Sequence, residues 1–287
     1  MSLEPFGKAQ SGTGFGKQTT RRRRKFDPAM AVPLNLPFWE MARSLDSEHC
    51  EGPLLGLSWA VMMHDQSCLS FSEHGAERFA NALAGRLADL RAALAHLPSE
   101  QAGVRIRGIE ALHPFLACDG AIGSIASNVL GQRCRPVRAI FFDKTAETNW
   151  SLAWHQDRTI CVQRWIDMDG FGPWTIKGGM QHVAPPFDLL RRMVTLRAHL
   201  DDVPATNAPL LIAPGSHAEG RVPVDLIEQV VSKCGTRVCT ADAGDLWLYA
   251  TPILHASEAA SRPAHRRVLQ VDYSADELPG GLEWLGV

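Results

Sequence analysis

His155 and Asp157 stand one residue apart in WHQDRTICV, the stretch that covers residues 154–162. An apolar, β-prone run follows them, and side chains at positions i and i+2 of a strand point to the same face. We therefore expect an imidazole nitrogen and a carboxylate oxygen to project together, as two ligands of one metal ion would. Taken alone, the pair is at least as typical of two polar residues at the solvated end of a strand.

His255 is the candidate for a third ligand, because it follows the apolar stretch DLWLYATPIL and precedes the polar loop ASEAASRPA. Two imidazoles and one carboxylate bind one face of Fe(II) and leave the opposite positions open. A ligand set without thiolate also suits Fe(II) better than a structural zinc site. The three residues together predict an iron site, although an isolated histidine at a strand end is more often structural.

Helical patterns occupy the first half of the chain. Residues 72–97 are rich in Ala and Leu and predict one long amphipathic helix, with Ser72 as a possible N-cap. Its apolar stripe, which we expect to pack in the core, consists of Phe79, Leu83, Leu87, Leu90 and Leu94. A second helix is expected over 113–130, ending at Gly131.

Strand patterns follow, separated by Pro, Gly, Asn and Asp. The expected strands are 136–144, 153–165, 193–200, 209–214, 236–240, 245–250 and 266–274. Helices first and strands later predict an α+β fold, in which a helical layer packs on an antiparallel barrel or sandwich. The segment 166–190 is long and rich in Gly and Pro, and we interpret it as an active-site lid.

Size and charge limit the classes of protein to consider. The 287 residues, 45% of them apolar and 21% charged, suit one large globular domain. A net charge of −2 gives no reason to expect a nucleic-acid or membrane partner. Oligomeric state is not readable from the sequence. Residues 1–26 contain the run Arg21–Arg24 near their end, and we interpret them as a flexible basic extension in preference to an anion-binding arm.

The cysteines predict a cellular compartment. There are seven, they are scattered, and none forms a CxxC pair. An odd number at irregular spacing is typical of reduced thiols and not of a disulfide framework. No apolar run reaches the roughly 18 residues of a membrane span, and the N-terminus lacks the apolar core of a signal peptide. We therefore predict a cytoplasmic location.

Several stretches of the second half resemble the phytanoyl-CoA dioxygenase family of Fe(II)/2-oxoglutarate oxygenases. In chain order they are FFDKT (141–145), WHQD (154–157), LRAHLDD (196–202), APGSH (213–217), GDLWLYATPILHAS (244–257) and HRRVLQVDYS (265–274). The resemblance implies a double-stranded β-helix, a jelly-roll barrel flanked by N-terminal helices. It implies a single oxygenase domain over 27–287, with a helical layer (27–135), a jelly-roll core (136–274) and a C-terminal tail (275–287).

The resemblance also implies roles for single residues. His155, Asp157 and His255 become the iron ligands, and Arg266, eleven residues after the last histidine, binds the distal carboxylate of 2-oxoglutarate. A guanidinium fork suits that carboxylate, whereas the adjacent Arg267 faces the other way. Further residues expected near the co-substrate are Ser257, Lys144 and Trp174. For Lys144 a surface position, and for Trp174 a role in anchoring the lid, remain open.

Arg197 and His199 alternate with Thr195 on one strand and share a face. If that face points into the barrel, they bind the co-substrate or an acidic group of the substrate. The alternative is a solvated outer face, or ion pairs with Asp201 or Asp202. His217, in the APGSH stretch, is interpreted as a turn residue.

The activity that the resemblance implies is hydroxylation of an unactivated C–H bond with Fe(II), 2-oxoglutarate and O₂, giving succinate and CO₂. The expected substrate is a small molecule: an amino-acid derivative, a lipid-like acid or a natural-product intermediate. A carboxylate at Asp157, where halogenating relatives have a small residue, favours hydroxylation over halogenation. Desaturation, cyclisation and epimerisation stay open, as do a non-catalytic jelly-roll binding protein and a zinc-dependent hydrolase.

Overall fold

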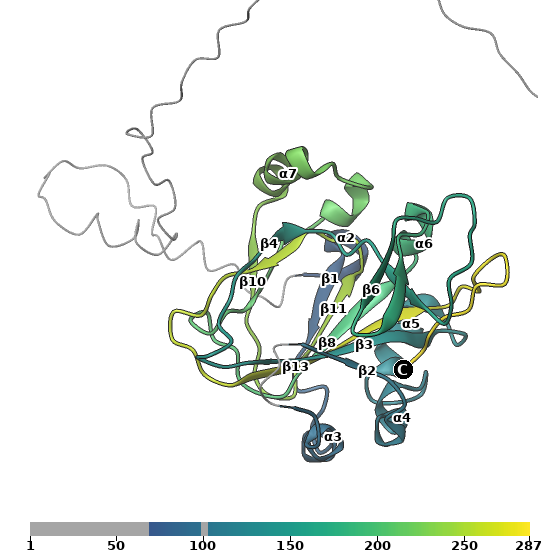
Figure 1. Cartoon of the computed structure of the whole chain (residues 1–287). Helices are drawn as coiled ribbons and strands as arrows, with labels where there is room; N and C mark the ends of the chain where they lie inside the picture. The colour runs from purple at the N-terminus through teal and green to yellow at the C-terminus, as the bar shows by residue number, and fades with distance from the viewer. Residues whose placement is uncertain (1–68, 99–102) are drawn as a thin grey trace, which may run out of the picture. The chain divides into compact units, whose positions relative to one another are not determined.

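The computed structural model describes residues 69–98 and 103–287. The expected basic extension 1–26, the start of the oxygenase domain at residue 27, and two of the seven cysteines, Cys50 and Cys68, lie outside the described residues. The described part has a mainly β core with helices packed around it (Figure 1).

Two antiparallel sheets form the core. The larger has the strand order β1 (Ala76–Phe79), β11 (Leu246–Ala250), β8 (Val194–His199), β13 (Arg266–Ser274), β3 (Arg135–Lys144), β2 (Val104–Ile106). The smaller has the order β10 (Arg237–Cys239), β9 (Leu210–Ile212), β12 (His255–Ser257), β4 (Leu152–His155). Neighbouring strands come from distant parts of the chain, and apolar residues of both sheets meet between them, for example Trp247 with Ile212. This is the predicted double-stranded β-helix, or jelly roll.

The larger sheet is buried on both faces, and this arrangement positions the site. On β8 and β13, Leu196, Ala198, Leu269 and Val271 point outward into a core that α3 (Leu87–Leu94), α4 (His113–Leu116) and α5 (Gly123–Leu130) complete. In Figure 1, α3 and α4 lie below the sheet. Because side chains alternate along a strand, the intervening residues of β8 and β13 point into the barrel.

The prediction of one long helix over 72–97 is wrong. The chain forms the short helix α2 (Phe71–His74), then β1, then α3. Gly75 ends α2 in the left-handed region (φ 70°), and Asn81 has φ 54°, so no continuous helix passes these positions. β1 pairs with β11 at the edge of the larger sheet. Leu83, Leu90 and Leu94 are nevertheless buried, as their predicted role in the core requires.

The second expected helix, 113–130, is interrupted between α4 and α5. A Cβ on Gly123 would lie 2.0 Å from the carbonyl oxygen of Ala117, so the chain comes too close to itself for any other residue there. The helix ends at Leu130, followed by Gly131 with φ 84°, as predicted. The short 3₁₀ helix η3 (Glu110–Leu112) precedes α4. The part of the chain expected to form the helical layer, 27–135, also contains the two strands β1 and β2.

The segment 166–190 is more ordered than a Gly/Pro-rich lid suggests. It contains the hairpin of β6 (Trp174–Lys177) and β7 (Met180–Val183), followed by α6 (Phe187–Arg191). The expected strand 153–165 is split into β4 and β5 (Ile160–Val162), and β5 pairs with β7 in a third sheet. This sheet packs on Leu282 and Trp284 of the C-terminal tail. The six other expected strands are present as β3, β8, β9, β10, β11 and β13.

The remaining elements lie over the smaller sheet. They are η4 (Ser216–Glu219), η5 (Val224–Leu226) and α7 (Ile227–Cys234). Ile227 and Val231 of α7 pack against Leu254, just before β12. Within the described ranges, no helix combines the length and the apolar character needed to cross a bilayer.

Candidate metal centre

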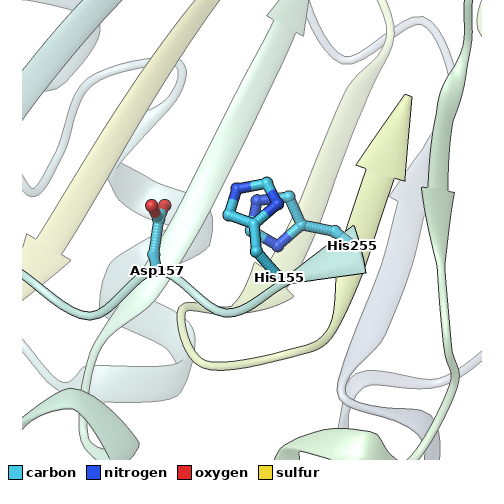
Figure 2. A group of neighbouring side chains, drawn as sticks. All are labelled: His155, Asp157 and His255. Carbon is cyan, nitrogen blue, oxygen red and sulfur yellow. The ribbon is translucent and has the colours of Figure 1, made fainter. Parts of the chain in front are cut away.

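Strand pairing brings the imidazole rings of His155 and His255 together. β4 and β12 are antiparallel neighbours, and His155 lies directly opposite His255, with the ring centroids 4.2 Å apart. Asp157 follows β4 and points the same way as His155 (Figure 2). One ligand atom from each of the three residues lies within 4.8 Å of the others. Among the described residues, this is the one group of His, Cys, Asp or Glu side chains compact enough to hold a metal ion.

The structure corrects how Asp157 reaches this position. β4 ends at His155, so Asp157 lies on the loop between β4 and β5 and not on the strand. Gln156 anchors this loop: its Nε2 donates to the carbonyl oxygens of Gly220 and Pro252, both at 2.9 Å, and its Oε1 accepts from the Val222 amide at 3.0 Å. Sequence reasoning missed this role. The only signal was a polar residue between two candidate ligands.

In both imidazoles, Nδ1 lies within hydrogen-bond distance of a backbone carbonyl oxygen. Nδ1 of His155 lies 2.8 Å from the Ala153 carbonyl oxygen, and Nδ1 of His255 lies 2.9 Å from that of Ile253. When Nδ1–H donates to a carbonyl, Nε2 is the deprotonated nitrogen available to a metal. Burial, and then the neighbouring His155, lower the pKa of His255 to about 4, so that ring is neutral at ordinary pH.

Asp157 is held by Arg138, which sequence reasoning also missed. The Nη2 of Arg138 donates to Asp157 Oδ2 at 3.1 Å. Burial alone would raise the pKa of Asp157, but the pKa is lowered overall, chiefly by the charge of Arg138. The carboxyl group is therefore ionised and ready to bind a cation. The available signal was the alternation of β3, which places Arg138 on the same face as Lys144.

A cavity of about 160 Å³ adjoins the three candidate ligands. Its other polar lining residues are Lys144, Arg197, Ser257, Arg266 and Gln270. Three cations thus face one carboxylate, that of Asp157. This excess of positive charge suits an anionic ligand.

Arg266 lies in the cavity and Arg267 lies outside it, as predicted from their alternation. Arg266 is 3% exposed, and its guanidinium donates to the Ala208 carbonyl, while its Nε has no partner among the described residues. Arg267 forms an ion pair with Asp201 on the other face. Burial and Arg197 lower the pKa of Arg266 to about 9, so it stays charged at neutral pH.

Lys144 lies opposite Arg266 on the neighbouring strand and is buried, not on the surface. Its Nζ donates to the Trp150 carbonyl at 2.7 Å and lies 3.3 Å from Ser257 Oγ. Burial and the charges of Arg266 and Arg197 lower the pKa of Lys144 to about 7. Its charge state is therefore divided near neutral pH.

Arg197 and His199 belong to the inner face of β8 and are both buried. The alternative expectation, that these two residues form ion pairs with Asp201 or Asp202, is wrong. Asp201 pairs with Arg267, and Asp202 accepts a hydrogen bond from the Ala243 amide at 2.8 Å. Nε of Arg197 and both ring nitrogens of His199 have no partner within the described ranges. Burial, with Arg197 and Arg266, lowers the pKa of His199 well below its usual value, so it is neutral.

Two other candidates lie away from the cavity lining. Trp174, on β6, contacts Trp165 at 5.7 Å between ring centroids and packs on the cluster around β5 and β7. This position suits the expected alternative, in which Trp174 anchors the segment 166–190. His217 lies in the 3₁₀ helix η4 and packs closely on Gly75.

The residues present fit an iron centre with a dicarboxylate beside it. Two imidazoles and an ionised carboxylate form a ligand set that suits Fe(II) and leaves positions open. The partnerless Nε atoms of Arg197 and Arg266 are buried donors, which ordinarily have acceptors. A carboxylate between them would supply the acceptors.

A jelly roll that brings two histidines and an aspartate together is the combination typical of non-haem Fe(II) oxygenases. The phytanoyl-CoA dioxygenase (PhyH) family model matches residues 105–268, more than half of the chain, and the chain belongs to this family. The family uses Fe(II), 2-oxoglutarate and O₂. No curated protein matches the chain significantly.

Solved structures share the fold at low sequence identity. EctD from S. alaskensis is 17% identical, with 71% of this chain and 74% of that chain covered and a TM-score of 0.51. SnoN, a non-haem α-ketoglutarate-dependent epimerase from nogalamycin biosynthesis, is 17% identical over 74% of this chain and 85% of that one, with a TM-score of 0.50. AviO1 from Streptomyces viridochromogenes Tue57 is 17% identical over 73% and 94%, with a TM-score of 0.50.

Proposed function

We propose that this protein is an Fe(II)- and 2-oxoglutarate-dependent dioxygenase that hydroxylates an unactivated C–H bond of a small molecule. One observation carries the proposal: the compact group of His155, Asp157 and His255 opens on a cavity lined by buried cations. The first feature suits the metal and the second suits the co-substrate. A non-catalytic jelly-roll protein that only bound a ligand would not need a metal site beside a cationic cavity.

The proposal gives each residue a task. His155 and His255 hold the metal through Nε2, and Asp157 holds it through a carboxylate oxygen. Arg266 binds the distal carboxylate of 2-oxoglutarate through its guanidinium. Further contacts to the co-substrate come from Arg197, Lys144 and Ser257, which line the same cavity. Trp174, which does not line it, is assigned to anchoring the adjacent segment.

The bound metal and co-substrate would supply the oxidising chemistry, in which O₂ and 2-oxoglutarate yield succinate, CO₂ and a hydroxylated product. The chain's own residues bind, orient and exclude water. A carboxylate at Asp157 fills the third protein position on the metal, which favours hydroxylation over halogenation. The same site is able to support desaturation, cyclisation or epimerisation, so the product must be identified. Incorporation of one ¹⁸O atom from ¹⁸O₂ into the substrate-derived product, in addition to the one that enters succinate, distinguishes hydroxylation from these three.

The apolar part of the cavity lining gives a small substrate a place to bind. The cavity of about 160 Å³ has Trp150 and Leu152 in its lining, and these side chains are 36% and 47% exposed. They form an apolar rim between the metal site and solvent. An amino-acid derivative, a lipid-like acid or a natural-product intermediate would meet this rim with an apolar group. The net charge of −2 gives no reason to propose a nucleic acid or a membrane as a further partner. The cytoplasmic location stays a prediction.

The test uses the two adjacent arginines of β13 as a matched pair. Anaerobic addition of Fe(II) and 2-oxoglutarate should give a visible charge-transfer band, and O₂ should then yield succinate. Arg266→Gln should abolish the band at co-substrate concentrations that saturate the wild type, because the distal carboxylate loses its partner. Arg267→Gln should retain it, because Arg267 pairs with Asp201 on the opposite face.

The result that would overturn the proposal is the absence of both the band and succinate from the wild-type protein. A band that survives unchanged in Arg266→Gln would overturn the assignment of Arg266 alone. A zinc-dependent hydrolase would instead turn over an ester or amide without O₂, and would respond equally little to both arginine substitutions.

A further inference from the structure

Arg138 lies between two buried carboxylates, and only one of them belongs to the candidate metal centre. Its Nη2 contacts Asp157 Oδ2 at 3.1 Å, and its Nε contacts Asp272 Oδ2 at 2.5 Å. The Arg138 side chain is 10% exposed and that of Asp272 is 2% exposed. Strand register builds this contact, because Arg138 of β3 lies directly opposite Asp272 of β13.

The contact continues into the larger sheet. The other carboxylate oxygen of Asp272 accepts from Thr195 Oγ1 at 3.0 Å, and Thr195 lies 3.0 Å from the hydroxyl of Thr251. The Nη1 of Arg138 also reaches the carbonyl of Thr159, on the loop that carries Asp157, at 3.4 Å. Three strands therefore hold the guanidinium in place, and the guanidinium in turn holds a loop residue.

We propose that Arg138 is a positioning residue, which occupies Oδ2 of Asp157 so that Oδ1 alone is presented to the metal. The inference rests on the proposed function, because it takes the metal to bind at His155, Asp157 and His255. A carboxylate that binds through one oxygen uses one coordination position, whereas one that binds through both uses two. Arg138 thereby keeps open a position that the co-substrate and O₂ require.

The two carboxylate contacts of Arg138 differ in kind. Its pairing with Asp272 joins two neighbouring strands and balances one buried charge. Its contact with Asp157 instead reaches a loop residue of the candidate metal centre, which the pairing of the strands does not require.

The experiment measures metal binding and not turnover. Metal-free protein is titrated with Co(II) in the absence of 2-oxoglutarate, with calorimetry for affinity and visible absorption for coordination. Arg138→Gln should bind Co(II) about 10–100-fold more weakly than the wild type, the usual cost of removing the partner of a metal ligand. Its visible spectrum should also change, because the freed carboxylate can bind through both oxygens.

Arg78→Gln is the matched control, because Arg78 also pairs with a buried aspartate, Asp245, through an Nε contact of 2.8 Å. It should lose stability in thermal unfolding but keep the Co(II) affinity and spectrum of the wild type. A purely structural role for Arg138 predicts the same outcome for Arg138→Gln. Co(II) affinity within twofold of the wild type, with an unchanged spectrum, would therefore overturn the inference.

Arg138→Lys keeps the test decisive if Arg138→Gln does not fold. A lysine retains the charge but cannot hydrogen-bond both carboxylates in the same fork geometry. A loss of Co(II) affinity of fivefold or more supports the inference, and a smaller loss overturns it. Failure of the proposed function looks different: His155→Ala would then bind Co(II) as well as the wild type does.

Discussion

Lys144 gives the cavity a pH dependence that can be predicted in sign. Its pKa is lowered to about 7 by burial and by Arg266 and Arg197, which lie on two other strands of the same sheet. A dicarboxylate bound nearby favours the protonated amine and raises this pKa, so binding takes up a proton. Affinity for 2-oxoglutarate should therefore be highest below pH 7 and fall several-fold by pH 8.5.

Calorimetry at saturating Co(II) between pH 6 and 8.5 measures this dependence. In Lys144→Met the affinity should be lower below pH 7 and nearly flat across the range, because the titrating amine is gone. Arg266 stays predominantly charged over this range, since its pKa is about 9. An unchanged pH profile in Lys144→Met would contradict the assignment of Lys144 to co-substrate binding.

At the residue scale, the sequence predicted which side chains come together but not what holds them. His155, Asp157 and His255 are recognisable because metal ligands must be of a few residue types. Arg266 is recognisable from its spacing after His255. Gln156 and Arg138 are not recognisable, because each acts through groups distant in the chain, such as the Gly220 carbonyl and Asp272.

At the scale of elements, the helical layer stabilises the face of the sheet that lies opposite the cavity. Leu90 of α3 is fully buried against the outer face of the larger sheet. Leu90→Ala should lower the free energy of unfolding by about 2–5 kcal/mol, because it leaves a cavity in a close-packed core. Urea denaturation measures this loss.

Leu226 of η5, which is 43% exposed, provides the control for Leu90. Leu226→Ala should change the free energy of unfolding by no more than about 0.5 kcal/mol. If Leu90→Ala were equally mild, α3 would not be part of the core as described. The apolar stripe of this segment would then have some other role.

The same segment shows why an element can be predicted wrongly while its burial is predicted correctly. Apolar residues at helical spacing over 72–97 predict which side chains are buried. They do not reveal that Ala76–Phe79 pairs with β11, because that partner lies about 170 residues further along the chain. The left-handed turn at Gly75 was visible only as a glycine, which many helices tolerate. The hairpin of β6 and β7 was missed for a similar reason, since its strands are short and flanked by Gly and Pro.

At the scale of the whole molecule, the barrel contains more positive charge than it can pair. Lys144, Arg197 and Arg266 line one cavity, and among the described residues no carboxylate forms an ion pair with any of them. Buried charges without partners oppose folding. The family's co-substrate is a dianion of suitable size, so we infer that the fold carries this cost in order to bind it, a trade-off between stability and function.

Arg197→Met tests that trade-off because it removes one charge and keeps a side chain of similar length. Without ligand, the variant should unfold at a higher temperature than the wild type, by about 2–4 °C for each kcal/mol gained. The stabilisation that millimolar 2-oxoglutarate gives the wild type should shrink in the variant, because the anion loses a partner. Thermal unfolding with and without 2-oxoglutarate measures both effects. A variant that is less stable without ligand, yet gains as much from 2-oxoglutarate as the wild type, would show that Arg197 serves packing against Phe142, which lies 5.4 Å from its guanidinium, and not binding.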